Sequence, residues 1–192
     1  SGAIASIVAA TTPEVAAAIL LVPAYGDEIS QADPNGDHFE LIRRTVVDAD
    51  LDALPKTTID PMPVVSADQA ETPSLLLGET AHPWFTGNGE GTTWVNEATF
   101  ARLDTPAPLD AQACVPHITA PTLMVIAEVD EMEGADADVA RQVFTTGPNT
   151  RVHATVEGGH FGLITVGTEH YERSLAAQLD FVRTHLVEEA AS

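Results

Sequence analysis

The strongest constraint on the fold is a regular alternation of strand-like and helix-like segments in the C-terminal part of the chain. Two short, largely apolar runs, TLMVIA at 122–127 and RVHATV at 151–156, flank the amphipathic stretch DADVARQVFTT at 136–146. The second run is followed by a longer amphipathic stretch at 169–187. Short apolar runs are typical of parallel strands that helices cover on both faces. This order predicts an α/β fold with a parallel sheet and right-handed crossovers.

The beginning of the chain adds one helix and one strand to this sheet. Residues 2–10 are small or apolar nearly all round the predicted helix, which indicates burial on several sides. The run AAAILLV at 16–22 is a further buried strand, which Pro23 ends.

The middle of the chain has a different texture, rich in proline and in aromatic residues, and we interpret it as a cap built of short helices. The stretch at 38–54 places Phe39, Ile42, Val46 and Leu54 near one helical face. The stretch WVNEATFARL does the same for Trp94, Phe100 and Leu103. The predicted segments are core residues 1–26, cap residues 27–116 and core residues 117–192.

The charge of the chain argues against several classes of partner. It contains 29 Asp and Glu against 8 Lys and Arg, a formal net charge of −21. Such a surface repels phosphate backbones and anionic lipids, so we expect neither nucleic acid nor a membrane as a partner. No apolar run approaches the roughly 20 residues that span a bilayer. The single cysteine, Cys114, excludes an internal disulfide and fits a reduced cytoplasm.

No cofactor or metal is expected from the motifs. The histidines His82, His117 and His153 lack the spacing of metal ligands. The glycine-rich stretch at 86–93 has neither the lysine nor the preceding strand of a phosphate-binding loop.

The first candidate site residue is Asp130, in VIAEVDEME. This apolar strand runs directly into acidic residues, and open α/β sheets place their sites at the carboxyl ends of strands. The alternative is an acidic turn that caps the next helix.

The second candidate is His160, in ATVEGGHFGLI. A strand ends at Val156, two glycines allow a sharp turn, and the histidine follows. A histidine in such a loop can act as a general base near neutral pH, although it can also simply bond a carbonyl group. An acid after one strand and a histidine after the next is an arrangement in which a carboxylate orients an imidazole.

The segments that contain Asp130 and His160 resemble a known protein family. The segments APTLMVIAEVDEM, RVHATVEGGHFGLI and ERSLAAQLDFVRTHL resemble the C-terminal half of an α/β-hydrolase, whose triad runs nucleophile, acid, histidine. The stretch from Trp94 to Asp130 is similar to the cap-to-strand junction of bacterial dienelactone-hydrolase-like and serine-peptidase-like members. The resemblance implies that Asp130 is the triad acid and His160 the triad base.

The resemblance also bears on the first residues. SGAIASIVAATTPEV resembles the helix that follows the nucleophile elbow G-x-S-x-G-G, with Ser1 and Gly2 at the paired glycines. The nucleophile would then lie two residues before Ser1. Two alternatives stay open: Ser1 is itself the nucleophile, with Ala3 as the small residue of the elbow, or Ser1 only caps the helix.

A sheet of three strands would leave an unpaired edge and a large apolar surface in water. We therefore expect a separate N-terminal polypeptide to supply the early strands, the oxyanion hole and the nucleophile. Cleavage of a precursor, through attack of the Ser1 hydroxyl on the preceding carbonyl or by a protease, is one route to such a break. A higher oligomer is left open.

The function implied is a serine-dependent hydrolase that acts on an ester, thioester or related carbonyl through an acyl-enzyme. Two alternatives remain: an acyltransferase or cyclase with the same triad, and a non-catalytic scaffold. Four cap aromatics, Trp84, Phe85, Trp94 and Phe100, are candidates for the lining of an acyl pocket, although each could instead pack the core of the cap. The sequence does not identify the substrate.

Overall fold

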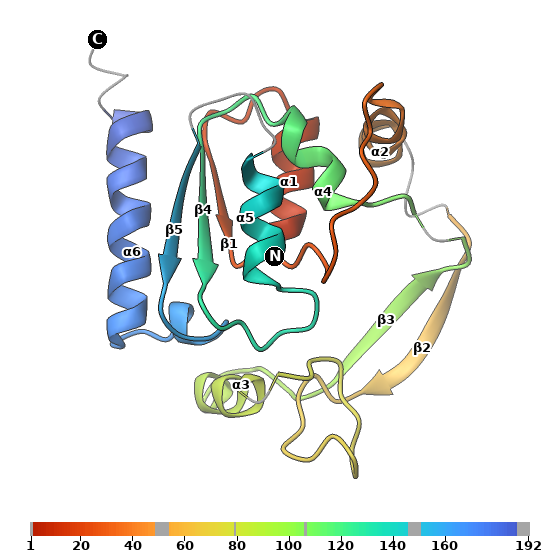
Figure 1. The fold of residues 1–192 in the computed structure, drawn as a ribbon. Coiled ribbons are helices and arrows are strands. Elements are labelled where there is room, and N and C mark those ends of the chain that lie inside the picture. The colour runs from red at the N-terminus through yellow and green to blue at the C-terminus, as the bar shows by residue number, and fades with distance from the viewer. Residues whose placement is uncertain (1, 49–53, 79, 106, 146–150, 188–192) are drawn as a thin grey trace.

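A three-stranded parallel sheet forms the centre of the computed structural model (Figure 1), which describes residues 2–48, 54–78, 80–105, 107–145 and 151–187. The elements are α1 (Gly2–Thr11), β1 (Ala18–Leu21), α2 (Asp37–Val47), β2 (Lys56–Met62), α3 (Ala81–Gly89), β3 (Ala98–Leu103), α4 (Ala111–Cys114), η1 (Val115–His117), β4 (Thr122–Ala127), α5 (Ala137–Thr145), β5 (Arg151–Val156), η2 (Gly162–Ile164), α6 (Glu169–Val182) and the π-helical turn η3 (Arg183–Val187).

The sheet has the order β1-β4-β5, and both of its strand pairs are parallel. The register pairs Ala18 with Thr122 and Thr122 with Arg151. The central strand β4 is buried along its whole length, because it has a neighbour on each side and helices on each face. The parallel sheet expected from the apolar runs is therefore confirmed.

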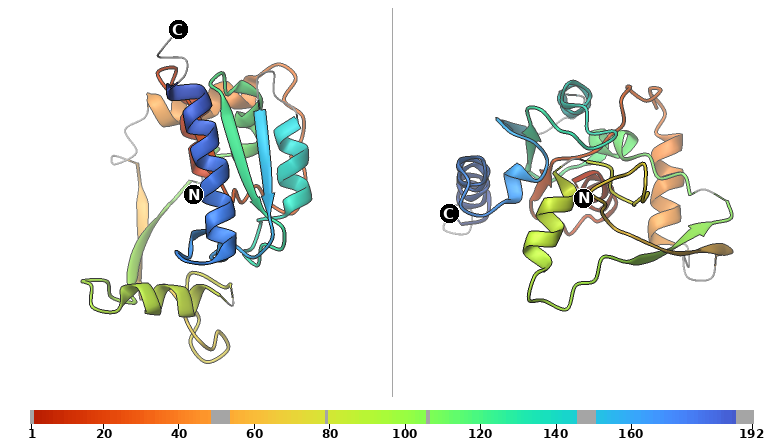
Figure 2. Two further views of the ribbon diagram at one scale, coloured as in Figure 1. Left: turned by 90° about the vertical axis from the view of Figure 1, so that its left-hand side faces the viewer. Right: turned by 90° about the horizontal axis from the view of Figure 1, so that it is seen from below.

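Helices cover the two faces of the sheet, with α6 on one side and α1 and α5 on the other (Figures 1 and 2). Side chains of β4 alternate between the two layers. Leu123 and Val125 pack with Phe181 of α6, whereas Met124 and Ile126 enter the core beneath α5. This alternation gives one strand two cores, as a doubly covered sheet requires.

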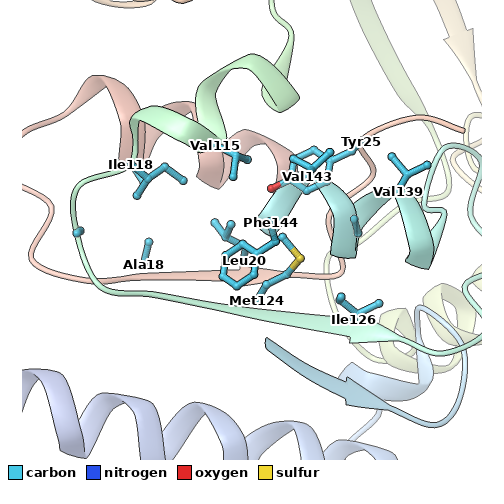
Figure 3. Packing of buried hydrophobic residues seen from close by; sticks show 13 residues of the cluster. Ala18, Leu20, Tyr25, Val115, Ile118, Met124, Ile126, Val139, Val143 and Phe144 are labelled. Atoms are coloured by element: carbon cyan, nitrogen blue, oxygen red, sulfur yellow. The ribbon is translucent and has the colours of Figure 1, made fainter. Parts of the chain in front are cut away.

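The larger core lies between the sheet and the layer of α1, α4 and α5 (Figure 3). Leu20 of β1 and Met124 of β4 meet Val143 and Phe144 of α5 there, and Val115 closes the cluster from the segment after α4. These side chains are at most 4% exposed. The burial predicted for residues 2–10 is confirmed only in part, since Ile4 is 67% exposed and Val8 is 47% exposed.

Residues 27–116, which the sequence predicts to be a cap built of short helices, differ in part from that prediction. Residues 98–103 form strand β3 rather than a helix, and β3 pairs antiparallel with β2. The expected helical face of Trp94, Phe100 and Leu103 is wrong. The β-branched run Thr57–Ile59 favours a strand in the partner segment, and cross-strand pairing such as Ile59 with Phe100 overrides the weak helical periodicity.

Part of the predicted cap lies over the edge of the sheet where the parallel strands end. Helix α3 and the loop before it lie beyond the carboxyl ends of the three parallel strands (Figures 1 and 2). Helix α2 ends at Val47, so Leu54 is not on its face, while Phe39, Ile42 and Val46 pack with Ile7 and Cys114.

Among the described residues, no helix combines the length and apolarity that crossing a bilayer requires.

Candidate active site

Two neighbouring strand ends carry the candidate acid and base. Strands β4 and β5 finish opposite each other, with Ala127 paired to Val156. The chains continue side by side beyond the sheet, because the Glu128 N–H donates to the Val156 carbonyl (2.9 Å) and the Val129 N–H donates to the Gly158 carbonyl (3.3 Å). Gly158 has φ of +112°, a conformation that favours glycine. The paired loops bring Asp130 and His160 to the same place.

Asp130 and His160 are in hydrogen-bond contact. The distance from His160 Nδ1 to Asp130 Oδ2 is 3.0 Å, and that to Oδ1 is 3.2 Å. The Asp130 side chain is 3% exposed and that of His160 is 17% exposed. The Met132 N–H also donates to Asp130 Oδ1 (2.9 Å), which fixes the carboxylate.

This contact determines which imidazole nitrogen is available for chemistry. A carboxylate on Nδ1 selects the tautomer with hydrogen on Nδ1, which leaves the lone pair on Nε2. In the described part of the chain, no hydrogen bond reaches His160 Nε2. The arrangement can therefore accept a proton at Nε2 and stabilise the resulting imidazolium.

Three of the four predicted pocket aromatics gather beside this loop. Phe161, which follows the histidine and is buried, lies 5.3 Å from Trp84 and 5.8 Å from Phe85 between ring centroids. Trp94 packs on Phe85 at 5.8 Å. The three cap rings thus belong to one cluster with Phe161, which also includes Val65.

The fourth aromatic does not join them. Phe100 lies on β3, where it is 39% exposed, and it pairs with Ile59 of β2. Within the cluster, the indole Nε1 of Trp84 is buried and has no hydrogen-bond partner among the described residues.

Glu131 is a further residue of the site, and the sequence does not single it out. The His160 backbone N–H donates to Glu131 Oε2 (2.8 Å), and the Thr80 hydroxyl of the cap donates to Glu131 Oε1. The run EVDEME contains Glu131 together with three other acidic residues, so the sequence does not show which of them contacts the histidine loop. The only signal was the adjacent pair of glycines before His160, one of which leaves room for this carboxylate.

A groove of about 510 Å³ opens at the acid loop. It is lined by Asp27, Leu77 of the cap and residues 130–136. Carboxylates make up most of its polar lining, so its potential is negative and it disfavours anionic ligands.

The amino end of α1 points to the same edge of the sheet. A Cβ placed on Gly2 would lie 2.5 Å from the Leu21 carbonyl oxygen and 2.9 Å from Pro23 Cα, just past the end of β1. Only glycine permits this approach of helix to strand. Ser1, the alternative nucleophile, lies outside the described residues.

No site for a metal is found in the part of the chain that the structure describes, since no three or more His, Cys, Asp or Glu side chains converge there.

Solved structures with a similar fold identify the architecture. DcsB, whose structure contains a substrate analogue, matches with a TM-score of 0.59 and 21% identity over 97% of this chain. The α/β-hydrolase GrgF from Penicillium sp. sh18 matches with a TM-score of 0.55 and 21% identity, also over 97%. The chain has an α/β-hydrolase fold. A monoacylglycerol lipase from Paleococcus ferrophilus matches at 0.50 and 11% identity over 94% of the chain.

The chain spans only part of the length of these structures: 62% of DcsB, 61% of GrgF and 65% of the lipase. No family model matches the sequence, and no curated protein matches it either. At these identities the comparisons establish the fold alone.

Proposed function

We propose that the chain carries the acid and base of a serine-dependent α/β-hydrolase that acts on an ester, thioester or related carbonyl. The hydrogen bond between the buried Asp130 carboxylate and His160 Nδ1, at the carboxyl edge of a parallel sheet, is the observation on which the proposal rests. Asp130 is the acid and His160 the base.

The reaction follows from the free Nε2 of His160. A serine hydroxyl transfers its proton to Nε2 as its oxygen attacks the substrate carbonyl, while Asp130 stabilises the imidazolium. Collapse of the tetrahedral intermediate expels an alcohol or thiol, which takes the proton from Nε2, and leaves an acyl-enzyme. A water molecule attacks the acyl-enzyme with the same proton transfers, releasing the acid and restoring the serine.

The nucleophile and the oxyanion hole are proposed to come from an N-terminal polypeptide that adds strands beside β1. Two features support this placement. Among the described residues, β1 pairs with β4 alone, so one of its edges carries unpaired backbone groups. On α1, which packs on β1, Ile4 and Val8 are exposed one helical turn apart. An apolar helix face beside an open strand edge is a surface that a further strand and its helix would cover.

Acidic side chains near the Asp130–His160 pair bear on the choice of substrate. Asp27, Glu133 and Asp136 line the groove beside the acid loop, so their charge is expected to make a neutral or cationic acyl compound react faster than an anionic one of equal size. Because screening weakens this repulsion, the preference should shrink as ionic strength rises.

Acyl transfer to an alcohol or amine is the second candidate. The buried Phe161 packs on His160, and the rings of Trp84, Phe85 and Trp94 belong to the same apolar cluster as Phe161. Exclusion of water by such a cluster favours an acceptor other than water.

A fluorophosphonate probe tests the proposal on the protein isolated with any chain that accompanies it. We expect one labelled serine, located by peptide mapping, and loss of labelling in His160→Ala. A control variant, His153→Ala, changes an exposed histidine and should label normally. Absence of labelling would instead support a non-catalytic scaffold. Product analysis with and without an added alcohol or amine separates hydrolysis from acyl transfer.

A further inference from the structure

One carboxylate joins the cap to the histidine loop. Glu131 Oε2 accepts a hydrogen bond of 2.8 Å from the backbone N–H of His160, and its Oε1 accepts one from the hydroxyl of Thr80. Asp130 meanwhile holds the ring of the same histidine. Two consecutive acids therefore fix His160, one through its side chain and the other through its main chain.

Two glycines allow neighbouring backbone to approach the acid loop closely. A Cβ on Gly159 would overlap Glu131 Oε2, so the carboxylate rests directly on the backbone of the histidine loop. On the cap side, a Cβ on Gly78 would lie 2.7 Å from Met132 Sδ and 3.3 Å from Glu131 Cγ. Two segments thus approach the acid loop through glycines, while the Glu131 side chain also borders an open pocket with Thr80 and Gly159.

The donor from the cap to this carboxylate is the hydroxyl of Thr80, at the start of α3. Thr80 is the residue before α3, a position where a threonine oxygen commonly accepts from the first turn of the helix. Here it makes no such cap bond, and its hydroxyl donates to Glu131 instead. The hydrogen bond from Thr80 to Glu131 therefore depends on the position of α3 relative to the acid loop.

We infer that Glu131 is a positioning residue that couples the seating of the cap to the placement of His160. The carboxylate can accept both donors at once, whereas an amide has only one accepting atom. When α3 moves away and Thr80 is withdrawn, Glu131 keeps only its bond to the loop and gains rotational freedom. His160 is then held less firmly. The catalytic meaning of this coupling rests on the proposed function, but the coupling itself does not.

Amide hydrogen exchange of the protein, isolated with any accompanying chain, tests the coupling without an activity assay. Glu131→Ala should speed exchange of the His160 amide about tenfold or more, because a hydrogen bond to a charged acceptor is lost. Glu128→Gln, which neutralises an exposed acid at the end of β4, is the matched control and should leave the His160 amide unchanged. Amides of α5 serve as an internal reference for global stability.

The role of the cap is tested by changing Thr80. Thr80→Val should speed exchange of the His160 amide roughly two- to tenfold, and Thr80→Ser should restore it because the hydroxyl returns. In a Glu131→Ala background, Thr80→Val should have no further effect. An unchanged His160 amide in Glu131→Ala, or an equal effect of Thr80→Val in both backgrounds, would overturn the inference.

The catalytic consequence has a separate readout. If the proposed function holds, Thr80→Val and Glu131→Gln should slow fluorophosphonate labelling, and Thr80→Ser should recover it. If no variant or parent protein is labelled while the exchange coupling persists, the proposed function fails and the coupling stands.

Discussion

His160 Nδ1 lies 3.0 Å from Asp130 Oδ2, and the aspartate side chain that holds it is 3% exposed. In the proposed function, this carboxylate fixes the imidazole tautomer and stabilises the imidazolium, so we expect it to contribute to the reaction rate more than to stability.

Asp130→Asn is therefore expected to lower the rate of fluorophosphonate labelling about 10³- to 10⁴-fold with little change in melting temperature. The amide oxygen can still accept from the Met132 N–H, but its NH₂ group or its rotation disturbs the bond to Nδ1. Labelling kinetics and thermal melts measure the two effects. Glu133→Gln removes a neighbouring carboxylate without touching His160 and controls for local charge. A rate within tenfold of the parent protein would remove Asp130 from the acid role.

Gly159→Ala is expected to disturb the histidine loop through a single clash. The new Cβ would overlap the Glu131 carboxylate, and overpacking of this kind costs about 1–3 kcal/mol. Removal of that carboxylate should relieve the clash, so Gly159→Ala should be nearly neutral in a Glu131→Ala background. Urea unfolding of the four proteins in the cycle measures this. Additive free energies of unfolding would show that the clash lies elsewhere.

The sequence predicted the core elements because their signals are local. The fully buried β4 and the amphipathic α5 and α6 each carry an apolar pattern that tertiary packing only reinforces. The prediction for β3 is wrong because its six residues gain their strand conformation from pairing with β2, whose partner residues lie far earlier in the chain, as in the pair Lys56 and Leu103. The sequence of β3 alone therefore does not indicate this pairing.

In the candidate site, too, the residues with a local sequence signal could be predicted and those that depend on tertiary contacts could not. Asp130 and His160 could be named because each follows a recognisable strand. Glu131 could not, because the choice between Glu128, Glu131 and Glu133 depends on which carboxylate faces the histidine loop. The pocket residues depended on the path of the cap, which brought Trp84 to Phe161 and left Phe100 on the hairpin.

The buried indole N–H of Trp84 gives a prediction about stability. Because this donor has no partner among the described residues, Trp84→Phe removes an unsatisfied polar group and should change the free energy of unfolding by less than about 1 kcal/mol. Trp84→Ala should destabilise by about 3–5 kcal/mol through the cavity it leaves against Phe85 and Phe161. Urea unfolding distinguishes the two. A large loss in Trp84→Phe would mean that the N–H is hydrogen-bonded in solution.

Cys114 is expected to be chemically inert in the folded protein. The thiol is fully buried, and burial, assisted by the nearby Asp110 carboxylate, raises its pKa to about 12. At pH 8 almost no thiolate exists, so Ellman's reagent should react only after denaturation. Rapid reaction of the native protein would show that the contact of α4 with α1 and α2 opens readily.

Helix α2 provides the pH-dependent prediction. The Arg43 and Arg44 guanidinium groups hydrogen-bond Glu40 and lower the pKa of its carboxyl from 4.5 to about 2. Since this pKa is depressed in the folded state, the stabilisation is present above pH 4.5 and is lost as the pH falls toward 2. Both arginines remain charged throughout this range.

Glu40→Gln should therefore reduce the loss of stability of α2 between pH 5 and pH 3, measured by exchange of its backbone amides. Glu14→Gln removes an exposed carboxylate that has no ion pair among the described residues, and it should preserve the pH dependence of the parent protein. Raised salt should weaken the Glu40 effect, because the pair is exposed to solvent and screened. An unaltered pH profile in Glu40→Gln would show that other carboxylates govern the acid sensitivity of this helix.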